Sequence, residues 1–224
     1  MKEAVSRNKW NFIIAIGCLW GLSEAAMGMY LRGACSRFIT GSIMTGGAIF
    51  FMASAQSFSK KMIPVLAVLG IAAGFKLLDA ALLGLPVLHG AIGNPIFAFY
   101  TEIFAFLMIF ALMDRSLRKK HGGRALLGGL SALVAVNLFP LVRFATGVPA
   151  CVVPGTGYPL ALYYAPIAVG LSAVTCPLGM AFGEKWASLS ARESSNVMIK
   201  KLVPVSLRFV PLICLALILL IRLG

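Results

Sequence analysis

The feature that most constrains this chain is a series of long apolar stretches separated by short, mostly basic connections. A helix that crosses a bilayer needs about 20 consecutive, mostly apolar residues. Seven stretches meet this requirement, at roughly 11–31, 38–58, 62–84, 95–113, 125–145, 159–183 and 202–222. We therefore predict an all-α, polytopic transmembrane bundle of about seven helices, with residues 1–224 forming a single domain.

One of the seven stretches is less secure than the others. Residues 38–58 contain Thr40, Ser42, Thr45 and Gln56 among their apolar residues. If this stretch does not span, the bundle has six transmembrane helices.

Composition excludes an ordinary soluble domain and argues against a nucleic-acid partner. Hydrophobic residues make up 60% of the 224 residues and charged residues only 12%, whereas soluble domains carry roughly 25% charged residues. The net charge of +13 is large, but the basic residues cluster between the apolar stretches, as they do in membrane proteins. We therefore expect the lipid bilayer, and no nucleic acid, as the main surrounding of the chain.

The distribution of lysine and arginine predicts the orientation. The N-terminal tail and the alternate connections on its side carry 14 Lys and Arg residues, whereas the other side carries four, namely Arg32, Arg37, Arg143 and Arg222. Because cytoplasmic connections are enriched in these residues, the N-terminus is predicted in the cytoplasm and the C-terminus outside. We expect a multi-pass protein of a cell membrane, the prokaryotic cytoplasmic (inner) membrane.

Two connections have a distinctive composition. Residues 114–124 are basic and either serve only as a topology signal or contact anionic lipid head groups or a cytoplasmic partner. Residues 146–159 are rich in Pro and Gly and carry no charge; they form either an outer re-entrant loop or lid, or a plain connector. Cys35 and Cys151 both fall on predicted outer connections, where they could pair.

Ionisable side chains inside a bilayer are costly, so they indicate function or internal pairing. Measured from the outer helix ends at about 1.5 Å per residue, polar groups of four helices lie at a similar depth of roughly 10–12 Å. Asp79 lies one turn above Lys76 on the same helix face, Arg143 lies nearer the mouth, and Trp20 lies one turn from Glu24. The predicted substrate-binding residues are Glu24, Lys76, Asp79, Glu102, Asn137, Arg143 and Trp20.

This polar layer has two interpretations. In the first, it lines an outward-opening pocket for a small polar or zwitterionic solute, or for a cation, and the protein acts in solute binding or transport. In the second, Lys76 pairs with Glu24 or Glu102 and the network only fixes helix packing, as in a structural or assembly factor of the membrane.

A membrane-embedded enzyme is the further alternative. Glu24, Asp79 or Glu102 would then act as acid, base or metal ligand on a lipid or isoprenoid substrate. However, the chain contains no Walker A, H-E-x-x-H, G-x-S-x-G or C-x-x-C motif. We therefore assign no catalytic residue, no metal ligand and no cofactor, and expect binding rather than catalysis.

A small-residue stripe, Gly17, Gly21 and Ala25, recurs at four-residue spacing in the first stretch. Such a face lets another helix approach closely, from the same chain or from a partner subunit.

With its outer polar layer and this stripe, the chain resembles the substrate-binding S components of energy-coupling-factor transporters. The resemblance is architectural and covers most of the chain. It implies an outer pocket, a stripe that meets a partner membrane subunit, and ATPase subunits as further partners. The family usually has six transmembrane helices, so the predicted seven depart from its pattern.

Overall fold

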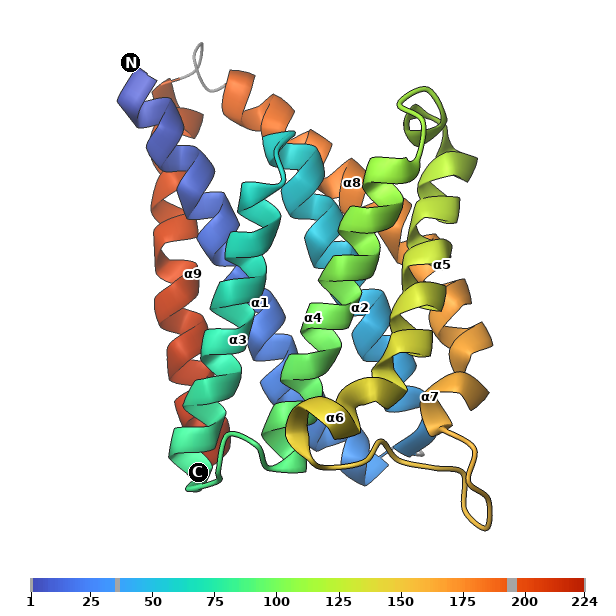
Figure 1. Ribbon diagram of the computed structural model, residues 1–224. Helices are drawn as coiled ribbons and strands as arrows, with labels where there is room; N and C mark the ends of the chain where they lie inside the picture. Colours follow the sequence, from blue (N-terminus) through green and yellow to red (C-terminus); the bar gives the residue numbers. More distant parts are fainter. Residues whose placement is uncertain (1, 35–36, 193–196, 224) are drawn as a thin grey trace.

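The computed structural model describes the backbone of residues 2–34, 37–192 and 197–223, and the side chains of residues 9–26, 39–190 and 207–222. Within these ranges the regular secondary structure is helical, apart from one isolated bridge between Val152 and Pro159. The long helices are α1 (Lys2–Ala34), α2 (Arg37–Ser59), α3 (Ile63–Leu83), α4 (Gly90–Leu112), α5 (His121–Leu138), α8 (Ala165–Arg192) and α9 (Val197–Leu223). They run side by side as a bundle (Figure 1).

Four helical segments of the described part are long and apolar enough to cross a membrane: Ile63–Leu83, Gly90–Leu112, His121–Thr146 and Ala165–Ser190. The helical membrane character predicted from the sequence therefore holds, and the number of seven spanning helices stays a prediction. The helix α2 has sufficient length, but polar residues such as Thr45 and Gln56 lower its hydropathy.

The helix α2 lies in the middle of the bundle, where it contacts α1, α3, α4, α5 and α8. Two of its buried serines are satisfied inside the protein. The hydroxyl of Ser54 donates to the carbonyl of Phe50 at 2.7 Å, and that of Ser57 donates to the carbonyl of Met180 in α8 at 2.9 Å. Because its neighbours are other helices rather than lipid, α2 tolerates polar residues that would be costly on the outside of a membrane bundle.

Glycines bring α8 into direct backbone contact with its neighbours. A Cβ atom at Gly179 or Gly183 would collide with the carbonyl oxygens of Phe50 or Ser54 in α2, and one at Gly128 of α5 with that of Ser172 in α8. Gly179 and Gly183 are separated by three residues, the spacing that permits close helix packing in membranes. These contacts hold α2, α5 and α8 together along their length.

Helix ends differ from the predicted segments for local reasons. The stretch predicted as one helix over 125–145 breaks into α5, the 3-10 turn η2 (Phe139–Leu141) and α6 (Val142–Thr146), because Pro140 has no N–H to continue the helical ladder. The stretch 159–183 divides into α7 (Leu160–Tyr163) and α8, which continues to Arg192.

The start of α4 also moves relative to its predicted segment. This helix begins at Gly90, five residues before the predicted start. The Nδ1 atom of His89 caps it by accepting a hydrogen bond from the N–H of Ala91 at 3.2 Å. His89 thus satisfies one of the free donors at a helix start.

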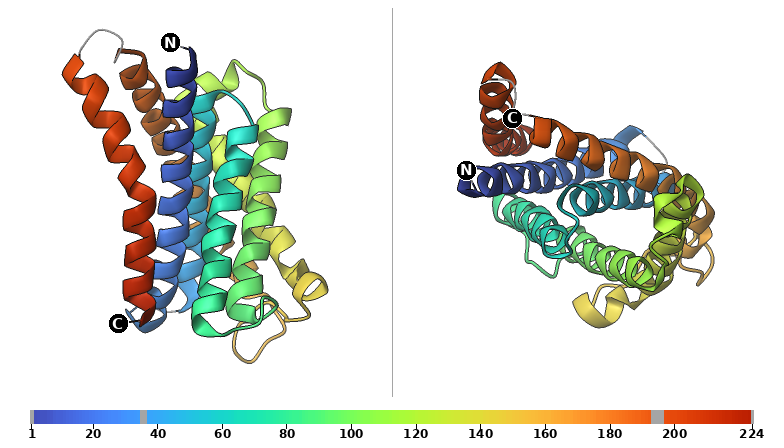
Figure 2. Two further views of the ribbon diagram at one scale, coloured as in Figure 1. Left: turned by 90° about the vertical axis from the view of Figure 1, so that its left-hand side faces the viewer. Right: turned by 90° about the horizontal axis from the view of Figure 1, so that it is seen from above.

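The connections alternate between the two ends of the bundle. The N-terminus lies at the same end as the α2–α3 and α4–α5 connections and the end of α8, whereas the C-terminus lies at the other end with the α3–α4 connection and residues 147–159 (Figures 1 and 2). We call these the N-terminal end and the C-terminal end. The basic connections predicted to share one side therefore do lie together.

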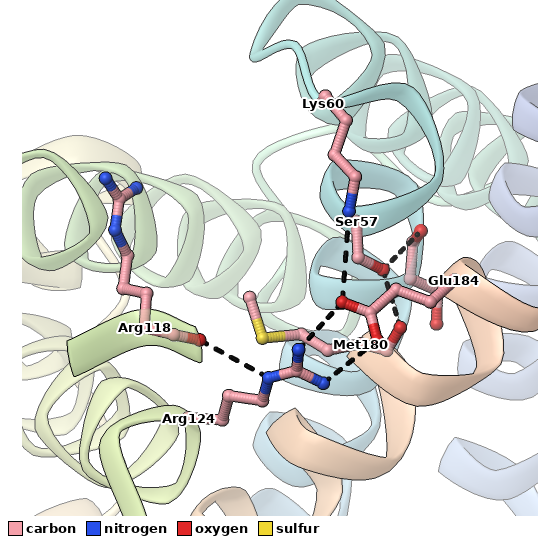
Figure 3. A network of polar contacts seen from close by, with 7 residues as sticks. Ser57, Lys60, Arg118, Arg124, Met180 and Glu184 are labelled. Carbon is pink, nitrogen blue, oxygen red and sulfur yellow. Dashed lines mark hydrogen bonds and ion pairs between the residues drawn. The ribbon is translucent and has the colours of Figure 1, made fainter. Parts of the chain in front are cut away.

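An ion cluster joins three helices at the N-terminal end (Figure 3). Arg124 of α5 binds both carboxylate oxygens of Glu184 in α8, at 3.1 and 2.8 Å, and Lys60 at the end of α2 lies 3.8 Å from the same carboxylate. The Nε–H of Arg124 also donates to the carbonyl of Arg118, in the turn η1 (Leu117–Lys119). Part of the basic stretch 114–124 is thus structural.

Residues 147–159 fold back on themselves at the C-terminal end. The N–H of Val153 donates to the carbonyl of Tyr158, and the N–H of Leu160 donates to that of Cys151, both at 2.9 Å, with Gly155 at φ +77° in the turn. Residues 147–159 therefore form a short hairpin-like loop between α6 and α7, at the end of the bundle (Figure 1). Cys151 is exposed, and Cys35, its predicted possible partner, lies outside the described residues.

Candidate ligand-binding cavity

A cavity of about 400 Å³ lies between the helices in the half of the bundle towards the C-terminal end. Its wall includes Gly90 and Ala91 at the start of α4 and Cys151 in the loop 147–159, so the cavity reaches that end of the molecule. This volume falls in the range of small-molecule pockets. The described polar residues on the wall are Glu24, Thr40, Ser42, Thr45, Lys76, Asp79, Asn94, Thr101, Glu102, Tyr164 and Arg222.

Two glutamates from different helices face this cavity. Glu24 of α1 is 7% exposed and Glu102 of α4 is 5% exposed. Within the described part of the chain, no Lys or Arg nitrogen lies within ion-pair distance of either carboxylate, and no side chain donates a hydrogen bond to Glu24. Glu102 has Thr45 of α2 and Glu24 of α1 as its electrostatic neighbours.

Asp79, in contrast, is fully engaged by cations. The guanidinium of Arg222 places Nε 2.9 Å from Oδ1 and Nη2 2.9 Å from Oδ2, and the ammonium of Lys76 lies 3.3 Å from Oδ2. Arg222 also donates from Nη2 to the carbonyl of Ala25 at 3.3 Å. Such a two-point contact is the strong geometry for an arginine–carboxylate pair, and here it joins α9 to α3 and α1.

The remaining wall of the cavity is uncharged. The charged residues come from α1, α3, α4 and α9, whereas α5, η2, α7 and α8 contribute apolar side chains such as Val136, Phe139, Leu160 and Ala168. In Figure 1, α3 and α9 stand on one side of the bundle and α5 and α8 on the other, with α4 between them. The cavity is therefore charged on one side and apolar on the other.

Four of the predicted binding residues come together on this wall. Glu24, Lys76, Asp79 and Glu102 arrive from α1 and α3, which run towards the C-terminal end, and from α4, which runs the opposite way (Figure 1). Their arrangement differs from the predicted pairing of Lys76 with Glu24 or Glu102, because the ion pair of Lys76 is with Asp79, three residues further along α3. Whether these residues bind a solute stays a prediction.

Three other predicted binding residues do not reach the cavity. Asn137 is exposed and donates to the carbonyl of Leu133 at 2.7 Å, since its neighbours Ala135 and Val136 are the residues of α5 that face inward. Arg143 is exposed on α6, with its guanidinium over the ring of Phe144 at 5.1 Å, because the break at Pro140 redirects the chain.

Trp20 is the third such residue, and it lies in the hydrophobic core. It is 1% exposed, and its ring packs against Phe99 and Phe51, with centroid distances of 5.0 and 6.4 Å. The one-turn separation from Glu24 is present, but the large ring fills the space between α1, α2 and α4 instead of lining the cavity.

The small-residue stripe of α1 packs inside the chain. A Cβ atom at Gly17 would meet Ile71, and one at Gly21 would meet Phe75, both in α3. Ala25 is 1% exposed. Of the two predicted uses of this stripe, the contact with another helix of the same chain is therefore the one observed.

Arg222, Thr45 and Thr101 are cavity residues that the sequence analysis missed. Arg222 was used only as one of the four basic residues on the predicted outer side. Thr45 and Thr101 were not distinguished from the other polar residues of α2 and α4. A usable signal was the placement of Arg222 at the outer end of an apolar stretch, the end towards which Asp79 also lies in its own stretch. Only the fold shows that these two helices are close.

No family model, curated protein or solved structure matches this chain. The functional argument therefore depends on the cavity itself. Among the described residues, no group of three or more His, Cys, Asp and Glu side chains is arranged to hold a metal ion. What the cavity offers is two carboxylates without cationic partners, several hydroxyls and an apolar wall, a set suited to non-covalent recognition.

Proposed function

We propose that this chain is a membrane solute-binding protein whose cavity opens on the non-cytoplasmic side. The observation that carries this proposal is the exposure of Glu24 and Glu102 to a cavity of about 400 Å³ without an ion pair in the described part of the chain. A buried carboxylate without a cationic partner is destabilising, so two such carboxyl groups facing one space favour a binding role over a packing role.

The proposed topology has seven spanning helices, α1 to α5, α8 and α9, with the N-terminus in the cytoplasm. It is supported by the length of these helices and by the 14 Lys and Arg residues on the N-terminal side against four on the other. With this orientation the cavity faces outward, which suits uptake from outside the cell.

A role as the substrate-binding subunit of an energy-coupling-factor system is the more specific form of this proposal. It requires a face for a partner membrane subunit. Since Gly17 and Gly21 are covered by Ile71 and Phe75, the partner would have to use another surface than the stripe that the resemblance implies.

Native mass spectrometry of gently purified protein tests the solute-binding proposal. We expect the wild type to carry a retained small molecule of constant mass. Glu24→Gln and Glu102→Gln should each lose this molecule while purifying in similar yield. The matched control is Asp114→Asn, a carboxylate change in the exposed α4–α5 connection, which should retain it.

Two results would overturn the proposal. One is an empty wild-type protein that also binds nothing when incubated with a concentrated extract of small metabolites. The other is a retained molecule that persists in both glutamine variants. Loss of folded protein in both variants would instead favour the packing role of the polar layer.

A further inference from the structure

The charges on the cavity wall are unequally satisfied. Of the two cations among the described cavity residues, Lys76 and Arg222, both form their ion pairs with Asp79. The charge of Lys76 acts on Glu24 without an ion-pair contact, and the like charge of Glu24 acts on Glu102. Three carboxylates thus face two cations, which leaves the site one positive charge short when all are ionised.

The missing positive charge is missing beside Glu24 and Glu102, and not beside Asp79. Arg222 is held by the carboxylate of Asp79 and by the carbonyl of Ala25. A ligand carboxylate would therefore have to compete with Asp79 for the cations, whereas a ligand cation at Glu24 and Glu102 displaces no ion pair. The wall favours a positive group over a negative one.

The apolar wall indicates what accompanies that positive group. Val136, Phe139, Leu160 and Ala168 line the side contributed by α5, η2, α7 and α8. These side chains offer no oxygen or nitrogen ligand to a bare metal ion, which prefers several such ligands. They do offer contact area to a hydrocarbon or aromatic body.

From these observations we propose that the cavity selects an amphipathic organic cation, with its positive group between Glu24 and Glu102 and its apolar body against α5, α7 and α8. This inference rests on the proposed solute-binding function and narrows its substrate class. In the same arrangement both cations of the wall stay paired with Asp79.

Four indole compounds that share one ring system and differ in charge test the inference: tryptamine (cation), tryptophol (neutral), indole-3-acetate (anion) and tryptophan (zwitterion). Binding to the full-length protein in detergent is measured by equilibrium dialysis and by the shift in unfolding temperature. We expect tryptamine to bind at least about tenfold more tightly than tryptophol, and indole-3-acetate to bind most weakly. Glu102→Gln should reduce tryptamine binding by about tenfold while leaving tryptophol binding unchanged.

The outcomes separate the inference from the function on which it rests. Equal or tighter binding of tryptophol, indole-3-acetate or tryptophan overturns the cation preference. If that binding is also weakened by Val136→Trp, which would fill the apolar side of the cavity, solute binding itself stands. If none of the four compounds binds and native mass spectrometry finds no retained molecule, both the inference and the proposed function fail.

Discussion

The guanidinium of Arg222, near the end of α9, donates hydrogen bonds to both carboxylate oxygens of Asp79 in α3, each at 2.9 Å. Figure 2 shows α9 at the edge of the bundle beside α1. Much of this helix is exposed, including Phe209, Leu212 and Leu220. The pair with Asp79 is therefore a principal polar attachment of a peripheral helix.

Replacing Arg222 by glutamine should destabilise the protein. Removing one partner of a buried ion pair costs about 3–5 kcal/mol, and both side chains are at most 9% exposed. The expected result is a lower unfolding temperature in detergent. Arg208→Gln, which alters an exposed arginine of the same helix, is the control and should change the unfolding temperature little.

A double variant, Asp79→Asn with Arg222→Gln, tests the pairing itself. Its loss of stability should be smaller than the sum of the losses in the two single variants. Equal unfolding temperatures for the two arginine variants would contradict this role.

The contact between α2 and α8 predicts different effects on stability for two glycine substitutions in one helix. Gly179→Ala places a methyl group against the carbonyl of Phe50, whereas Gly170→Ala meets no atom within 4 Å. The first should cost about 1–3 kcal/mol through overpacking, and the second should be neutral or stabilise by up to about 1 kcal/mol because alanine favours helix. Unfolding monitored by circular dichroism in detergent compares the two. Similar stabilities would show that α2 and α8 are not in backbone contact.

The ion cluster at the N-terminal end predicts a modest and salt-dependent effect. Glu184→Gln removes the contacts with Arg124 and Lys60, but its side chain is 40% exposed. We therefore expect a loss of only about 1 kcal/mol at low salt, which shrinks as ionic strength rises. Unfolding temperatures of both proteins over a salt series provide the measurement. A large loss that is independent of salt would mean that the cluster is buried in the membrane protein as it exists in lipid.

Cysteine labelling tests the proposed orientation. Cys151 is exposed at the C-terminal end, whereas Cys18, Cys176 and Cys214 are buried. In a Cys35→Ser background, a membrane-impermeant maleimide should label Cys151 in intact spheroplasts. The matched variant Cys151→Ser, Ser116→Cys carries its thiol in the α4–α5 connection and should react only after permeabilisation. The reverse pattern would invert the topology and place the cavity on the cytoplasmic side.

The length of the apolar stretches and the placement of charge predicted the long helices and the ends that share their connections, because both are local properties of the sequence. Glu24, Lys76, Asp79 and Glu102 could also be placed at one depth from helix geometry alone. Depth along a helix does not give the direction of a side chain around it. Asn137 was misplaced for this reason, since one residue further along a helix turns the side chain by about 100°. Arg143 was misplaced because the effect of Pro140 on α5 was not anticipated.

The pairing of the charges could not be predicted, because it depends on which helices are neighbours. The stretch that ends with Arg222 is the last in the chain, and only the fold brings it against α3 and α1. The same holds for Gly179 and Gly183, whose contact with α2 is not visible in their own sequence. To predict contacts between helices that are distant in the sequence, one needs a structure or information on which pairs of positions are in contact.

An experimental structure of the protein with its retained solute is the most direct test of the central claim. The account predicts density for a small molecule within hydrogen-bonding distance of both Glu24 and Glu102, with Asp79 still bound to Arg222. Density elsewhere in the protein, or a closed site in which Lys76 or Arg222 neutralises the two glutamates, would contradict it.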